Sequence, residues 1–210
     1  MLKLKKIYRK VLRYNIVKKY KKNIQNKNFT IISSNCIGGL IYHDLGMQFK
    51  SPTINMYIKA NDFIKLCKNL KKYMDEELIE IKDNIYKFPI AKLGDIYLYC
   101  VHYKNFNDVY NKWNKRKKRI NYNNIYIIMS DRDGCTDENI KEFDELDYKN
   151  KVIFVHKRMD NIKSSYYIKG TENNDKRNRI INITEYKGKF TGKRYYEDFD
   201  FVTFLNNRGV

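Results

Sequence analysis

The sequence has few of the features that build membrane spans, linkers or repeats. It holds no run of about 18 apolar residues, so no transmembrane helix is predicted. The basic N-terminus lacks a continuous apolar stretch and a small-residue cleavage site, so no secretory signal is predicted. Proline occurs only twice, and neither a Pro- or Ser-rich linker nor an internal repeat is present. We therefore expect a basic amphipathic helix over residues 1–28 and a single α/β domain over residues 29–210.

Cysteine is also scarce, and its pattern excludes the common zinc modules. The four cysteines are Cys36, Cys67, Cys100 and Cys135, and none of them forms a CxxC pair. Three of them lie in or beside apolar stretches, which favours small buried side chains over a disulfide framework. This pattern predicts a reduced, cytoplasmic chain.

Acidic residues are absent from one long segment, and the net charge of +19 is unevenly placed. Residues 1–28 hold eleven Lys or Arg and no acid, and residues 104–119 hold seven against one acid, Asp108. The rest of the chain is about neutral, so the charge describes two surfaces and not a fold.

The N-terminal charge accompanies a helical pattern over residues 2–24. Apolar side chains recur there at helical spacing among lysines, namely Leu4, Ile7, Tyr8, Val11, Val17, Tyr20 and Ile24. Two interpretations remain open. The apolar face could pack on the domain, or it could lie on an anionic membrane surface and hold the protein at the inner face of the cell membrane.

Between residues 29 and 156, strand-like apolar runs alternate with helical patterns. Strands are predicted over residues 29–34, 53–58, 96–102, 125–129 and 152–156. Helices are predicted over residues 62–74, 105–120 and 137–146, with Asn61, Asn105 and Thr136 as their caps. This alternation predicts a Rossmann-like three-layer α/β/α fold with a mainly parallel sheet.

Two polar loops follow strong strands, over residues 33–39 and 130–134. In parallel sheets ligands bind beyond the carboxyl ends of the strands, so these loops predict the site.

The chain resembles a known bacterial family at these loops. The matching stretches are FTIISSNCIGGLIYHDLGMQFKSPTINMYI, FPIAKLGDIYLYCVHY, WNKRKKRINYNNIYIIMSDRDGCT and YKNKVIFVHK, in this order. They are similar to the domain of unknown function 1919 family, whose members are often labelled exopolysaccharide biosynthesis proteins. The sequence departs from the resemblance at Ile37, where a large aromatic residue is expected. The resemblance implies a Rossmann-like fold and a role in cytoplasmic steps of surface polysaccharide assembly.

The second loop holds Asp131 and Asp133 in an Asp-x-Asp arrangement after an apolar strand. Two short carboxylates offer hard oxygen ligands for Mn²⁺ or Mg²⁺, which would bridge the diphosphate of a nucleotide-sugar. The alternative is a turn in which the Asp side chains accept bonds from backbone amides. Arg132 or Arg116 could instead bind phosphate directly.

The first loop places Cys36 where a nucleophile could sit, and a nucleophile needs a base. Candidate bases are the histidines, above all His102, and the candidate base for glycosyl transfer is Asp44 or His102. The alternative for Cys36 is a small apolar side chain at a tight corner.

The same loop offers polar groups and flexible backbone for a ligand. Ser34 and Asn35 can donate hydrogen bonds to a substrate, and Gly38 and Gly39 can let the backbone approach a phosphate at a helix start. A turn required only by packing is the alternative for the two glycines. A similar strand followed by Asn-Cys occurs in another polysaccharide-locus family that is thought to bind coenzyme A, so acyl-coenzyme A is a second donor to consider.

Three functions follow from these patterns. The first is a transferase in exopolysaccharide or capsule synthesis, with glycosyl transfer from a nucleotide-sugar ahead of acyl transfer, acting on a polysaccharide precursor. The second is a non-catalytic binding or assembly factor at an anionic membrane surface. The third is a nonspecific nucleic-acid binder, suggested by charge alone, and no specific nucleic acid is expected.

Overall fold

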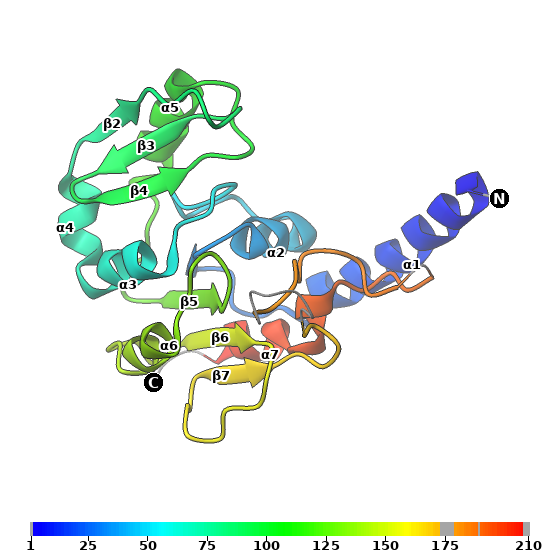
Figure 1. Ribbon diagram of the computed structural model, residues 1–210. Helices are drawn as coiled ribbons and strands as arrows, with labels where there is room; N and C mark the ends of the chain where they lie inside the picture. The colour runs from blue at the N-terminus through cyan, green and yellow to red at the C-terminus, as the bar shows by residue number, and fades with distance from the viewer. Residues whose placement is uncertain (1, 173–178, 189, 208–210) are drawn as a thin grey trace.

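The computed structural model describes residues 2–172, 179–188 and 190–207, with side chains from residue 7 onward. Its elements run in the order shown in Figure 1: α1 (Leu2–Asn23), β1 (Thr30–Ser33), α2 (Ile37–Leu45), α3 (Ala60–Lys68), α4 (Leu70–Asp75), β2 (Leu78–Ile81), β3 (Ile90–Leu93), β4 (Ile96–Tyr99), α5 (Phe106–Lys117), β5 (Ile125–Ser130), α6 (Asp137–Asp144), β6 (Lys151–Val155), β7 (Ser165–Tyr167), the 3-10 helix η1 (Tyr195–Asp198) and α7 (Phe201–Asn206).

A parallel sheet of four strands forms the centre, in the order β1-β5-β6-β7. Thr30 pairs with Ile125, and Ile127 pairs with Lys151. The predicted apolar runs supply β1, β5 and β6, and the predicted parallel sheet is confirmed. The edge strand β7 was not predicted, because its three half-buried residues, Ser-Tyr-Tyr, carry no apolar run.

Alternate side chains of this sheet enter two separate apolar cores. Ile31 and Ile128 point to one face, where α2 and α7 pack. Ile32, Ile127 and Met129 point to the other face, where α3 and α6 pack. This period of two residues buries both faces of the sheet and produces the three-layer arrangement of the predicted Rossmann-like α/β fold.

A second, antiparallel sheet of β2, β3 and β4 was not predicted. The apolar run over residues 96–102 supplies only β4, which pairs with β3 and not with the parallel sheet. A turn at residues 94–95 joins the two strands, and Gly94 has a φ of 58° there, which favours glycine. The small sheet packs on α3 and α5 and extends the core beyond one side of the parallel sheet (Figure 1).

Two local predictions were wrong. Residues 53–58 form turns and not a strand, with Asn55 at a φ of 64° and one isolated bridge between Tyr57 and Tyr99. The helix predicted over residues 62–74 starts at Ala60 and is interrupted at Asn69, which separates α3 from α4. Its expected cap is also wrong, since Lys59 precedes the helix.

Two of the expected helix caps are confirmed. The side chain of Asn105 accepts a hydrogen bond from the backbone N–H of Asp108 at the start of α5. Thr136 and Asn139 form a reciprocal capping box at the start of α6. Both caps are local in sequence, which explains why the sequence identified them.

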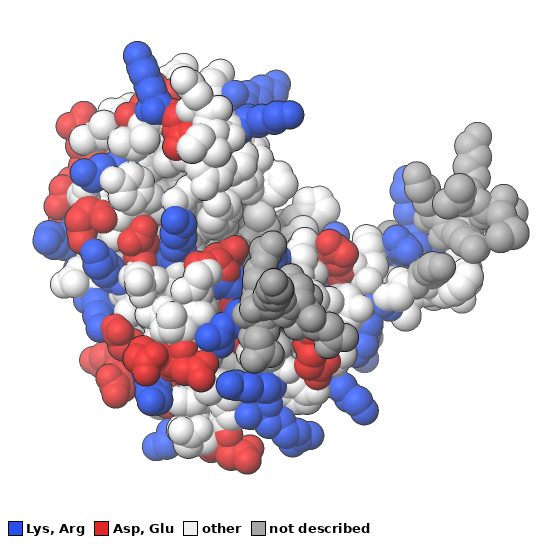
Figure 2. Space-filling model, viewed as in Figure 1, with Lys and Arg blue, Asp and Glu red and all other residues white. Residues whose placement is uncertain are grey.

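The helix α1 packs on the body along its second half and stands out from it along its first half (Figures 1 and 2). The ring of Tyr20 meets the ring of Phe201 edge-on at 4.7 Å. Gly192 lies so close to the helix that a Cβ there would be 2.7 Å from the backbone nitrogen of Arg13. Tyr20 and Ile24 of the expected apolar face therefore pack on the domain, whereas Ile7, Tyr8 and Val11 of the same face are exposed.

Arg13 ties α1 to two other elements through buried charges. Its guanidinium donates to both carboxylate oxygens of Glu197 at 2.7 Å and forms an ion pair with Asp44 of α2. Burial works against the charge of Arg13, but the bond to Glu197 and the two carboxylates together raise its pKa above the usual arginine value. One cation thus compensates two nearly inaccessible carboxylates.

Candidate functional site

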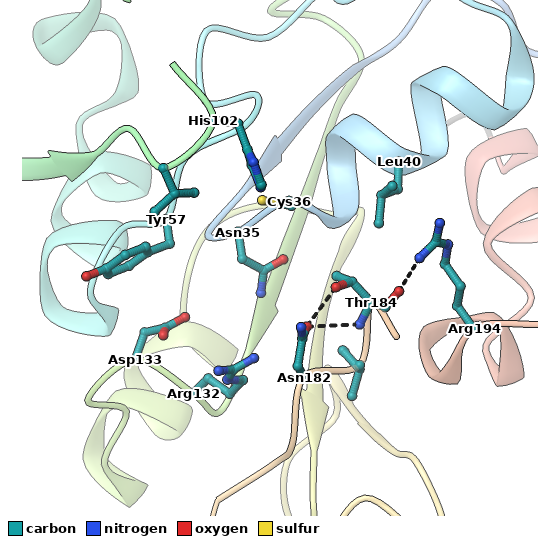
Figure 3. A pocket seen from close by; sticks show the side chains of 12 residues that line it. Asn35, Cys36, Leu40, Tyr57, His102, Arg132, Asp133, Asn182, Thr184 and Arg194 are labelled. Carbon is teal, nitrogen blue, oxygen red and sulfur yellow. Dashed lines mark hydrogen bonds between the residues drawn. The ribbon is translucent and has the colours of Figure 1, made fainter. Parts of the chain in front are cut away.

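A cavity of about 480 Å³ lies at the carboxyl edge of the parallel sheet (Figure 3). Its wall is formed by the loops after β1, β4 and β5 and by a later segment around residues 182–184. We call it the sheet-edge cavity. Five side chains predicted for the site from the sequence line it: Asn35, Cys36, His102, Arg132 and Asp133.

Asn35 holds the ends of two strands together at the cavity wall. Its amide nitrogen donates to the hydroxyl of Ser130 at 3.0 Å, and its carbonyl accepts from the N–H of Ile37 at 3.1 Å. The side chain therefore starts α2 and fixes β1 against β5. Ser34 is buried beside it and does not line the cavity.

The two glycines of the first loop serve close packing. A Cβ on Gly38 would lie 3.0 Å from the Cβ of Ser33, and one on Gly39 would lie 3.1 Å from the side-chain oxygen of Asn55. Both residues belong to the first turn of α2, and neither lines the sheet-edge cavity. These contacts fit the alternative in which packing alone requires the two glycines. That a ligand contacts these glycines stays a prediction, and only their backbone amides could make such a contact.

Arg132 and Asp133 present opposite charges to the cavity from the loop after β5. Among the described residues, no ion pair or hydrogen bond of the Arg132 guanidinium is present. Asp133 has a φ of 55°, and burial raises the pKa of its carboxyl, an effect that the charge of Arg132 opposes. A second cavity of about 460 Å³ shares Arg132 and Asp133, which therefore stand between the two.

His102 enters the sheet-edge cavity from the opposite side, on the loop after β4. Its side chain is exposed, and Figure 3 shows it pointing toward Cys36. The cavity thus holds an imidazole, a carboxyl and a guanidinium from two loops that are about 30 residues apart in sequence. Such a set can exchange protons and bind an anion.

The family model described as "Domain of unknown function (DUF1919)" matches residues 7–206. The chain belongs to the DUF1919 family. It is also 38% identical over 205 residues to an "Uncharacterized protein" of Haemophilus influenzae, covering 98% of this chain and 97% of that protein.

Asp131 does not reach the sheet-edge cavity of this DUF1919 protein. It is fully buried, with one oxygen bound to the backbone N–H and ring Nδ1 of His156 and the other bound to the N–H of Ile180. For Asp131, these bonds fit the alternative in which its carboxylate accepts hydrogen bonds from backbone amides and does not bind a metal. No group of three or more potential ligands gathers among the described residues. A metal role for Asp131 and Asp133 stays a prediction, and a metal at Asp131 would have to displace these bonds.

Asp44 and Arg116 also lie away from the cavity. Asp44 is the buried partner of Arg13. Arg116 donates to the hydroxyl of Tyr103 at 2.7 Å and lies over the ring of Phe49 at 5.1 Å. Their predicted roles, as a base and as a phosphate ligand, therefore receive no support from the geometry of this DUF1919 chain.

Among the residues of the cavity wall that sequence reasoning missed, four carry polar side-chain groups: Tyr57, Asn182, Thr184 and Arg194. Three of them belong to the segment after residue 164, where the pattern of the sequence loosens. Arg194 donates to the backbone carbonyl of Thr184, so this bond joins two residues of the cavity wall. No strand-end motif marks these residues, and no signal in the sequence could have found them.

We expect Cys36 to react slowly with alkylating agents. Burial, and then the charge of Asp133, raise the pKa of its thiol to about 11. The thiolate fraction at pH 7.5 is then about 100-fold below that of an ordinary cysteine. Iodoacetamide labelling of the native protein, followed by mass spectrometry of the Cys36 peptide, measures this rate.

The matched control for this labelling is Asp133→Asn, which should speed alkylation of Cys36 because it removes the negative charge. Labelling of Cys36 at the rate of free cysteine would contradict the prediction and return the residue to consideration as a nucleophile.

Proposed function

We propose that this protein is a transferase of exopolysaccharide assembly that uses a donor linked to a nucleoside diphosphate. The observation that carries the proposal is the convergence of His102, Arg132 and Asp133 on one cavity at the carboxyl edge of the parallel sheet. Parallel α/β sheets bind their ligands at this edge. The proposed role in polysaccharide assembly rests on the label that members of the resembled family often carry.

The donor class follows from Arg132, whose guanidinium has no ion pair or hydrogen bond with another described residue. A phosphate is its natural partner, because two parallel N–H bonds match two phosphate oxygens. The start of α2 lies at the same wall, and the amides of a first helical turn favour an anion. Arg132 also stands between two cavities, which fits a donor with a diphosphate between two larger groups.

Within this class we favour a nucleotide-sugar over an acyl-coenzyme A. The wall of the sheet-edge cavity includes the amides of Asn35 and Asn182 and the carboxyl of Asp133, beside apolar residues such as Leu40, Val101 and Ile183. These groups can pair with the hydroxyls of a sugar, whereas a thioester and its acyl chain offer them few partners. Acyl transfer stays the runner-up, since coenzyme A also carries a diphosphate.

The chemistry assigned to the residues is that of a glycosyl transfer. His102 takes the proton of an acceptor hydroxyl as that oxygen bonds to the anomeric carbon of the donor sugar. The bond between this carbon and the phosphate oxygen breaks, and the electron pair leaves with the diphosphate. Arg132 stabilises the charge that develops on this leaving group. A Mn²⁺ or Mg²⁺ ion bound to Asp133 would act on the same charge.

Thermal unfolding of the purified protein with candidate donors tests the proposal. We expect a nucleotide-sugar at about 100 times its Kd to stabilise the protein by about 2.7 kcal/mol. For a chain of this size this corresponds to a rise in Tm of about 5–11 °C. The arms are nucleotide-sugars, acetyl-coenzyme A and free nucleoside diphosphates, each with and without Mn²⁺.

The Arg132→Ala variant should weaken donor binding at least tenfold, since a charged hydrogen bond contributes about 1.5–3 kcal/mol. Arg158→Ala is the matched control, because Arg158 is an exposed arginine outside both cavities. A shift with acetyl-coenzyme A alone would favour acyl transfer. A Mn²⁺-dependent shift lost in Asp133→Ala would favour the metal version. The absence of a shift with every donor would contradict the proposal.

A further inference from the structure

The outer face of α1 carries large apolar side chains that no other part of the described chain covers. We define this outer face as Ile7, Tyr8, Val11 and Tyr14. Ile7, Val11 and Tyr14 are exposed by 59%, 55% and 66%, and their spacing of four and three residues places them in one stripe along the helix. Four such side chains within about two turns of helix exceed the scattered exposure that is normal on a surface.

The helix cannot turn this stripe inward, because its other side is already fixed. Arg13 is bound to Asp44 and Glu197, and Tyr20 packs on Phe201. Arg9 lies over the ring of Tyr186 at 4.7 Å, so the contact with the body reaches into the projecting half. The helix therefore has one docked side and one outer side, each with its own apolar residues.

The charge around the outer face indicates what covers it. Residues 1–28 hold no acid, and three exposed lysines of α1 lie near or beyond the stripe, namely Lys10, Lys18 and Lys22. A second copy of the chain would bring an equally basic helix against this one, which like charges oppose. A surface that is apolar beneath and negatively charged above complements both features, and an anionic phospholipid bilayer is such a surface.

We propose that α1 docks the protein on an anionic phospholipid surface through its outer face. Ile7 and Val11 enter the boundary between head groups and acyl chains, and the hydroxyls of Tyr8 and Tyr14 stay at the level of the head groups. The lysines pair with lipid phosphates. This docking is peripheral, since no helix of the described residues is long and apolar enough to cross a membrane. The site lies outside the sheet-edge cavity and does not depend on the proposed transfer reaction.

Co-sedimentation of the full chain with vesicles tests this docking. The probes are vesicles of equal parts phosphatidylglycerol and phosphatidylcholine, and vesicles of phosphatidylcholine alone. We expect strong binding to the first at 0.1 M NaCl and weak binding to the second. Binding should fall as salt rises to 0.5 M, because the Debye length shortens from about 10 Å to about 4 Å.

The decisive variant replaces Ile7, Val11 and Tyr14 by serine. It should lose at least about tenfold in vesicle partitioning, because three apolar side chains no longer enter the lipid. Its matched control replaces Ile79, Ile85 and Tyr97 by serine, three exposed apolar residues of the antiparallel sheet and the loop beside it. That control should bind vesicles like the wild type. Far-UV circular dichroism of both variants shows whether α1 remains helical.

Three results would overturn the proposal. One is equal binding by the wild type and the Ile7, Val11 and Tyr14 variant, which would leave charge as the only attraction. Another is a lack of binding to anionic vesicles at 0.1 M NaCl. The third is a wild-type dimer in sedimentation velocity that the same variant converts to a monomer, which would assign the outer face to a second copy of the chain.

Discussion

Replacing Arg13 by methionine is expected to lower the free energy of unfolding by about 3–5 kcal/mol, the usual effect of removing one partner from a buried ion pair. The variant leaves the carboxylates of Asp44 and Glu197 without their cation. Their side chains are only 7% and 0% exposed, so water cannot replace the lost bonds. Urea unfolding followed by circular dichroism measures the change in the free energy of unfolding. The slope of this free energy against urea concentration should be the same in the variant and the wild type, as expected when both unfold in a two-state transition.

Two further variants separate this effect from the loss of any large side chain. Arg158→Met removes an exposed arginine and should change stability by no more than about 0.5 kcal/mol. The triple variant Arg13→Met, Asp44→Asn and Glu197→Gln should recover much of the loss, because no uncompensated buried charge remains. An Arg13→Met protein within about 1 kcal/mol of the wild type would show that the network contributes little.

The His102→Ala variant is expected to lower kcat by about 10²–10⁴-fold if the proposed transfer reaction occurs, the usual effect of removing a general base. The expected KM is nearly unchanged, because the anion is held by Arg132 and not by His102. Release of the nucleoside diphosphate from the nucleotide-sugar that gives the largest thermal shift measures both constants. This prediction rests on the proposed function.

Chemical rescue distinguishes a base from a side chain that only shapes the cavity. Added imidazole can take over the role of a missing base, so it should restore part of the rate of His102→Ala. His43→Ala is the matched control, because His43 is exposed and belongs to α2 outside the cavity. A normal kcat in His102→Ala would remove this residue from the mechanism while leaving the donor-binding test unaffected.

The predicted elements that are correct are those whose signals are local. The apolar runs of β1, β5 and β6 and the caps Asn105 and Thr136 need only neighbouring residues to be recognised. The wrong or missing predictions concern segments whose secondary structure depends on tertiary contacts. The stretch over residues 53–58 looks like a strand, yet turns place it against α2, where Gly39 contacts Asn55. The antiparallel sheet was missed because β2 and β3 are four residues long and partly polar.

The candidate site divides along the same line. Parallel strands end at the same edge of a sheet, and this rule correctly predicted that Asn35, Arg132 and Asp133 line one cavity. His102 also lines it, although its strand β4 belongs to the antiparallel sheet. The rule could not tell that Asp131, two residues before Asp133, turns inward to His156. A carboxylate at a strand end can face the ligand or the protein, and only the groups around it decide which.

The sequence by itself determined the parallel α/β core, the uneven charge and the basic N-terminal helix, because periodicity and composition act over short stretches of chain. The tertiary structure alone decided which polar residues of the loops face a cavity and which are consumed by internal bonds. It also decided that α1 uses one apolar side for the body and leaves another exposed. These outcomes depend on partners such as Glu197 and Ile180, which are far away in sequence. A buried polar group forms hydrogen bonds with whichever groups the fold places beside it, and the spacing of residues in the sequence does not identify these partners.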